Sequence, residues 1–176
     1  MIFGVTPLMM AAASREREVV TIGNSWETPG ERSLWALDGM TFYNFSGAAR
    51  TGDWALGGFI PSEPGVFNIS AELDLTHLLD FGAYEFTLSF WHRTETGSLS
   101  LNSNIDRSAT IVAASGNANF SAVSNQSTTY AEYVTALAER TGISALRINA
   151  TARRATTSSI YRVPLFDDWS ATFTPI

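Results

Sequence analysis

The sequence predicts an all-β protein: a two-sheet antiparallel jelly-roll β-sandwich, preceded by an extended N-terminal arm. Apolar and polar side chains alternate in several short runs, as they do in strands with one buried face. Turn residues separate these runs about every ten residues, which is the spacing of sandwich folds. Aromatic residues, threonine, serine and glycine are prominent, and this composition favours strands joined by turns.

The clearest strand covers residues 84–93. Its apolar face, which we expect to line the core, consists of Tyr84, Phe86, Leu88 and Phe90. Trp91 falls instead on the polar face. There it either packs under a loop or offers a flat apolar surface to a ligand or partner.

The remaining elements follow from the same patterns. Before the clearest strand we expect a turn at residues 26–30, a loop and strand at 33–45, and strands at 19–22, 54–60 and 66–75. Gly57 and Gly58 indicate a bulge or a close approach of another segment. After it we expect a long surface loop at 115–129 and strands at 98–101, 109–113, 145–151, 160–165 and 169–173.

Residues 129–142 fit two structures. Thr129 and Glu132 have the spacing of a capping box, and Gly142 is a suitable helix stop. The same segment also alternates through Tyr133 and Leu137, as a strand would. Local rules alone favour the helix.

Composition excludes several classes of function. The chain of 176 residues suits one domain, and it contains no cysteine and no lysine. Disulfides, thiolate metal sites and lysine Schiff bases are therefore excluded. The net charge of −6 gives no basic stripe for nucleic acid, so we expect no nucleic-acid partner. No window is long and apolar enough to span a membrane.

Residues 1–18 form the predicted arm, and residues 19–176 form the predicted sandwich. The arm begins with an apolar cluster, but no charge precedes Arg15 and Pro7 interrupts the run, unlike a secretory signal. An exposed cluster of this kind marks an interaction site. We expect subunit contacts in a homo-oligomer such as a trimer, made by Ile2, Phe3, Val5, Leu8, Met9 and Met10.

Four motifs in order resemble the carbohydrate-binding-module-like (galactose-binding-like) jelly rolls. They are VTIGNSWETPG at 20–30, the strand at 84–93, the pair at 130–133 and 146–148, and FDDWSAT at 166–172. The resemblance implies the jelly-roll fold from about residue 20 to the end. It also implies that the segment after Thr129 is a strand, and we adopt that prediction. Trp26 stands where the family usually has phenylalanine, and the first 18 residues have no counterpart.

The resemblance further implies a structural calcium ion. The family often holds calcium between its opening glutamate and closing aspartate, which correspond to Glu27 and Asp168, with Asp167 beside them. Calcium prefers several oxygen ligands, so carboxylates from the two chain ends would suit it. The alternative is that Asp167 and Asp168 form only a solvated turn.

We expect no enzymatic activity and assign no catalytic residues. There is no Gly-x-Ser-x-Gly motif, and His77 and His92 lack the spacing of metal ligands. The run from Glu72 to Leu75 resembles the catalytic strand of laminarinase-type glucanases. Thr76 and His77 stand where that strand has its last glutamate, so the acid is missing.

Two functions remain. The preferred one is a structural protein of a phage or virus particle, a capsid decoration (cement) or tail protein, held to other virion proteins by the arm and located in the virion. The alternative is a stand-alone, extracellular carbohydrate-binding module. In that case the residues expected to stack on sugar rings are Trp91, Trp54, Trp35 and Tyr43.

Overall fold

A computed structural model describes residues 17–176, with the exception of 46, 62, 97–102, 123–128 and 155–161. The predictions for the apolar cluster of the arm and for a strand at 98–101 lie outside the described residues. No helix within the described ranges is long and apolar enough to cross a membrane.

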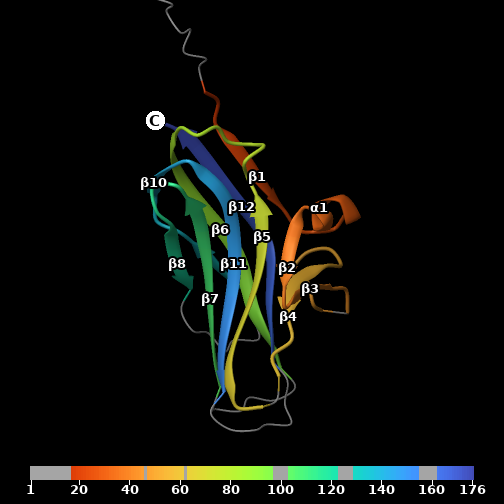
Figure 1. The fold of residues 1–176 in the computed structure, drawn as a ribbon. Coiled ribbons are helices and arrows are strands. Elements are labelled where there is room, and N and C mark those ends of the chain that lie inside the picture. The colour runs from red at the N-terminus through yellow and green to blue at the C-terminus, as the bar shows by residue number, and fades with distance from the viewer. Residues whose placement is uncertain (1–16, 46, 62, 97–102, 123–128, 155–161) are drawn as a thin grey trace, which may run out of the picture.

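The chain forms two antiparallel β-sheets packed face to face (Figure 1). The seven-stranded sheet, here sheet A, contains β1 (Val20–Asn24), β3 (Met40–Tyr43), β4 (Ala55–Gly58), β6 (Ala83–Thr96), β9 (Ala131–Val134), β10 (Ala138–Thr141) and β12 (Arg162–Pro175). The five-stranded sheet, here sheet B, contains β2 (Trp35–Asp38), β5 (Gly65–Asp74), β7 (Ser103–Ala113), β8 (Ala118–Ala122) and β11 (Ile143–Arg154). The predicted jelly-roll sandwich is confirmed.

Two long strands, β6 and β12, form the middle of sheet A. They pair with each other over most of their lengths. The other edge of β6 pairs with β9 and β10, and the other edge of β12 pairs with β1 and β4. In sheet B the order is β2-β5-β11-β7-β8. The first strand of the chain, β1, and the last, β12, are therefore neighbours in sheet A.

The core lies between the two sheets, where β6 contributes its predicted apolar face. Phe86, Leu88 and Phe90 are each no more than 1% exposed. Phe90 packs against the rings of Tyr133 and Phe166. The alternation of residues 84–93 thus predicted the buried face of this strand correctly, because one side of sheet A faces the other sheet.

The two glycines of β4 are sites of close approach, as predicted. A Cβ atom on Gly57 would lie 2.6 Å from the carbonyl oxygen of Pro164 in the neighbouring strand. A Cβ atom on Gly58 would overlap the side chain of Ile69 in the opposite sheet. Only glycine lets β4 pack this tightly.

Three local predictions need comment. The loop predicted at 115–129 contains a strand, β8, which pairs with β7. A short helix, α1 (Pro29–Ser33), lies at the end of the turn predicted at 26–30. The strand alternative for residues 129–142 is correct, since β9 and β10 both pair with β6.

Candidate functional site on the outer face of sheet A

A β-bulge in β12 shapes the site. Asp168 and Trp169 together oppose the single residue Phe90 of β6, and Asp168 has a positive φ of 39°. The extra residue changes which face the following side chains occupy. Trp169 consequently points into the core, whereas Asp167 pairs with Trp91 on the outer face of sheet A.

The Asp167 carboxylate is buried under a loop that crosses this face. It accepts hydrogen bonds from the backbone N–H groups of Arg50 (2.6 Å), Thr51 (3.1 Å) and its neighbour Asp168 (2.8 Å). Burial raises the pKa of Asp167 to about 6, although these three donors act to lower it. Asp167 therefore holds the backbone of the loop in place.

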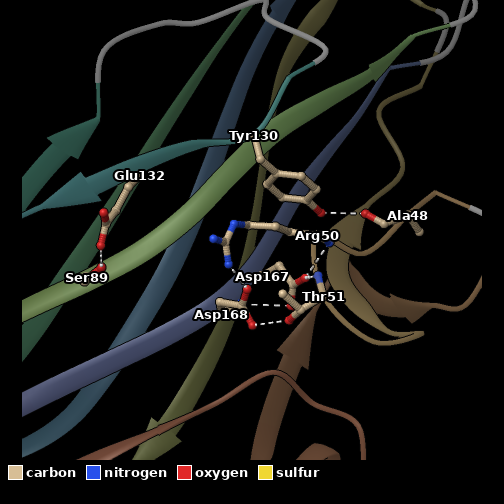
Figure 2. A network of polar contacts seen from close by, with 8 residues as sticks. All are labelled: Ala48, Arg50, Thr51, Ser89, Tyr130, Glu132, Asp167 and Asp168. Carbon is tan, nitrogen blue, oxygen red and sulfur yellow. Dashed lines mark hydrogen bonds and ion pairs between the residues drawn. The ribbon is translucent and has the colours of Figure 1, made fainter.

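Asp168 holds the same loop through side chains (Figure 2). Its carboxylate accepts from the Thr51 hydroxyl at 2.6 Å and from the Arg50 guanidinium at 2.5 Å. The ion pair is partly exposed, so we expect it to contribute to loop position more than to stability.

Glu27 fixes the other end of the loop. Its carboxylate accepts from the N–H of Asp53 at 3.0 Å and from the N–H of Trp54 at 3.1 Å. Gly52 lies against this carboxylate with a φ of +63°, and a Cβ atom there would overlap it. The acidic residues predicted as calcium ligands thus hold one loop, which we name the clamped loop (residues 47–54).

The hydrogen bonds of these carboxylates bear on the predicted calcium site. Their carboxylate oxygens face N–H and hydroxyl donors, whereas a cation needs oxygens that point toward it without intervening hydrogen atoms. In the ranges that the structure describes, no three His, Cys, Asp or Glu residues are placed to hold a metal. Calcium binding stays a prediction of the sequence, whereas these hydrogen bonds lead us to expect that removing calcium has no effect.

Trp91 lies at the border of the clamped loop. Its ring is half-buried, and the Arg50 guanidinium lies 3.8 Å from the ring centroid. Glu132 of β9 is its direct partner across the strands, so both side chains are on the outer face. Ser89 donates to Glu132 at 2.6 Å (Figure 2), which leaves an exposed carboxylate beside an aromatic ring.

Tyr130 connects β9 to the clamped loop. Its hydroxyl donates to the carbonyl of Ala48 at 2.5 Å, and burial raises its pKa above the usual value. Arg93 of β6 lies over the Tyr130 ring, 5.2 Å from its centroid, and donates to the carbonyl of Gly47. These contacts hold the clamped loop and β9 on either side of Trp91, so the surroundings of the ring are fixed in position.

The other predicted stacking residues lie elsewhere. Trp35 is only 5% exposed and packs edge-on against Trp26 and Trp169, so its predicted role as a stacking ring is wrong. Tyr43 is half-buried in a small apolar cluster beneath the clamped loop. Trp54 is half-buried under the guanidinium of Arg32, at 3.8 Å.

Sequence reasoning missed the polar members of this site. Arg50 belonged to no motif, Ser89 was considered only as a polar-face residue of the 84–93 strand, and Glu132 only as part of a capping box or a strand motif. The alternation of residues 84–93 places Ser89 and Trp91 on one face. The strand register that sets Glu132 opposite Trp91 depends on a pairing 41 residues apart, which no local pattern contains.

Comparison with known proteins finds similarity only among solved structures. No family model and no curated protein matches the chain. Among solved structures, the xylan-binding CBM22-1 domain of Paenibacillus barcinonensis Xyn10C aligns at 13% identity with a TM-score of 0.52, covering 88% of this chain and 94% of that domain.

Two further solved structures align with the chain. The CBM22-1–GH10 modules of Clostridium thermocellum Xyn10B, solved with xylohexaose, align at 13% identity with a TM-score of 0.51, covering 87% of this chain and 28% of that one. The tailspike protein 4 of bacteriophage CBA120 aligns at 11% identity with a TM-score of 0.47, covering 82% of this chain and 20% of that one. The first two matches confirm the jelly-roll fold of carbohydrate-binding modules; the tailspike match is too distant to support an argument.

Proposed function

We propose that this chain is a non-catalytic glycan-binding domain, and that it binds through the outer face of sheet A. The observation that carries the proposal is the cross-strand pair of Trp91 and Glu132. It sets an aromatic ring beside an exposed carboxylate, on a face that also has hydroxyl-bearing and charged side chains and the exposed Val134 opposite Ser89. Sugars require this combination, since their C–H faces pack on rings and their hydroxyls form hydrogen bonds.

Different residues supply the apolar contact and the hydrogen bonds. The part of the half-buried Trp91 ring that Arg50 does not cover supplies apolar contact, while Glu132 accepts hydrogen bonds from sugar hydroxyls. Arg50 covers the ring with a guanidinium already paired to Asp168, so it can donate to the ligand without adding net charge. The balance of acidic and basic groups favours a neutral glycan over a strongly charged one.

A row of hydroxyl groups extends the face away from Trp91. Ser89 pairs with Ser170, and Thr87 pairs with Thr172, whose hydroxyl lies 3.2 Å from that of Thr21 on β1. Such a row can hold successive sugar units of a chain by hydrogen bonds. Polysaccharides are therefore better first ligands than monosaccharides.

The test is binding to a panel of soluble polysaccharides, beginning with xylan, which the first structural neighbour binds. Affinity electrophoresis would identify a ligand and calorimetry would measure its Kd. Trp91→Ala and Glu132→Gln should each weaken binding about tenfold or more, roughly 1.4 kcal/mol. Val66→Ala, an exposed apolar position of sheet B, is the control and should bind as the unmodified chain does. Absence of binding across the panel, or equal binding by Trp91→Ala, would reject the proposal.

A structural role in a phage or virus particle remains the second candidate. It rests on the apolar cluster at residues 2–10, which has no place in a glycan site. The two functions imply different locations, extracellular for the first and the virion for the second. Self-association through the arm separates them and is taken up below.

A further inference from the structure

An open apolar hollow lies at one end of the sandwich, away from the proposed glycan site. It has a volume of about 510 Å³ and is lined by residues 76–81, 112–114 and 142–144. Its lining includes the buried side chains of Leu79 and Ile143. Phe81 also lines it and is 75% exposed, the highest value among the large apolar side chains that the structure describes. A hollow of this size with an exposed phenylalanine beside it has the features of a docking surface.

The N-terminal segment enters the sandwich beside this hollow. Arg17 donates to the carboxylate of Asp80 at 3.5 Å, and Asp80 also lines the hollow. Arg17 donates in addition to the carbonyls of Ala83 at 3.2 Å and Ile176 at 2.5 Å. Figure 1 shows the start of β1 and the C-terminus at the same end of the molecule.

Further contacts fix the side chain of Arg17 against the sandwich. The Arg17 guanidinium lies 5.2 Å from the centroid of the Tyr84 ring. It passes directly over Gly82, where any Cβ atom would overlap it. Arg17 is therefore held at a defined point, and the chain before it starts one arginine side chain away from Asp80 at the hollow.

We propose that the apolar N-terminal segment of this same chain, residues 2–10, docks into this hollow. Six large apolar side chains lie in this segment, and no charged side chain precedes Arg15. The connection from residue 11 to residue 16 spans up to about 20 Å when extended, which is ample to turn back from Arg17. Among the described residues that line the hollow, Asp80 has the only carboxylate, and it is already paired with Arg17.

The chain's own segment is favoured over that of a second copy. A connection of only six residues gives its segment an effective concentration of about millimolar at the hollow. A separate copy at micromolar concentration competes poorly against that. The proposal is independent of glycan binding, because none of the residues involved belongs to the Trp91 site.

The absence of cysteine from the chain allows a direct test. Cysteine is introduced at Phe3, Leu8 or Met10 in turn, each combined with Ala114→Cys at the hollow. The control combines the same arm positions with Val66→Cys, which is 62% exposed at the opposite end of β5 from the hollow. At least one Ala114→Cys pair should form an intramolecular disulfide about tenfold faster than its control, because proximity raises the effective concentration.

A second variant ties the effect to the hollow. Adding Phe81→Asp to the fastest pair should slow the crosslink to the rate of the control, since a charge at this exposed position opposes apolar docking without disturbing the core. Equal rates for the Ala114→Cys and Val66→Cys pairs would overturn the proposal. A product that is a crosslinked dimer would also overturn it, in favour of docking between copies.

Discussion

At the scale of single residues, two buried titratable groups have pKa values shifted in opposite directions. Burial and, to a smaller extent, the nearby Arg107 guanidinium lower the pKa of His92 to about 4. The Nδ1 atom of His92 has no hydrogen-bond partner within the described part of the chain. Burial raises the pKa of Asp167 to about 6. His92 is on the core face of β6, whereas Asp167 lies under the clamped loop on the outer face.

These shifts predict a compensated pH dependence of stability. Unfolded histidine binds a proton below about pH 6.5, whereas folded His92 does so only near pH 4, so its contribution to stability is lost as the pH falls between these values. Folded Asp167 takes up a proton near pH 6, before the unfolded chain does, so its contribution is present at low pH and is lost as the pH rises from about 4 to 6. The two slopes should largely cancel in the unmodified chain.

Single substitutions should expose each slope. In His92→Gln the free energy of unfolding should fall as the pH rises from 4 to 6, and in Asp167→Asn it should increase over the same range. Each slope is expected at up to about 1.4 kcal/mol per pH unit. Urea unfolding at several pH values measures it. Asp74 and Asp80 have lowered pKa values and add their effects only below about pH 4, outside this window. Slopes identical to that of the unmodified chain would contradict the prediction.

Whether the protein binds calcium also depends on a few single residues. Because the oxygens of Glu27, Asp167 and Asp168 face N–H and hydroxyl donors, we expect that a chelator leaves the melting temperature unchanged and that added calcium does not raise it. Asp168→Asn should lower stability slightly by weakening the contacts to Arg50 and Thr51. A melting temperature that drops on chelation, recovers with calcium, and no longer responds in Asp168→Asn would establish the calcium site instead.

At the scale of elements, the clamped loop depends on one glycine more than on another. Gly47 and Gly52 both have positive φ values, +80° and +63°. A Cβ atom on Gly47 meets nothing within 4 Å, whereas on Gly52 it overlaps the Glu27 carboxylate. Alanine at either position introduces similar backbone strain, but only at Gly52 must Glu27 also give up its hydrogen bonds to the loop.

Gly52→Ala should therefore destabilise the protein by about 1–3 kcal/mol more than the matched control Gly47→Ala, which is the cost of leaving such hydrogen bonds unmade. Chemical denaturation measures both. Gly52→Ala should also weaken any glycan binding, because the clamped loop positions Arg50 over Trp91. Equal losses for the two variants would show that Glu27 does not stabilise the loop.

The same local signature had opposite outcomes in two elements. Thr28 and Glu31 form a capping box with both hydrogen bonds present, and Pro29 suits the first turn of the resulting helix. Thr129 and Glu132 have the same spacing, yet Glu132 lies in a strand that pairs with β6. Residues 131–141 form more backbone hydrogen bonds by pairing with the edge of β6 than they would form in one helical turn. β8 was missed for the same reason, since its pairing with β7, not its polar composition, makes it a strand.

At the scale of the whole molecule, the fold followed from local patterns but the site did not. Alternation predicted most strands of the two sheets, because one face of such strands is buried; the family resemblance decided residues 129–142, and β8 was missed. The site joins Arg50, Trp91, Glu132 and Asp168 through contacts between distant segments. These four residues are too far apart in the sequence to form a recognisable motif. The strand register and the bulge of β12 bring them together.

Self-association is the property of the whole molecule that separates the two candidate functions. The sequence predicts that the arm contacts another subunit, whereas the hollow beside Arg17 offers it a site on its own chain. We expect the full chain and a chain that begins at Arg17 to be monomers at micromolar concentration in light scattering. The shortened chain keeps the Arg17 contacts, so it should stay folded.

Removing the arm should instead uncover the apolar hollow, and a dye that binds apolar surface should fluoresce more strongly with the shortened chain. Phe81→Asp in the shortened chain should reverse that increase, because Phe81 is the most exposed apolar side chain lining the hollow. A full chain that forms a defined oligomer, and that becomes monomeric on losing residues 1–16, would show that the arm joins subunits. That outcome would move the role in a virus or phage particle ahead of glycan binding, since a closed assembly needs such a contact between copies.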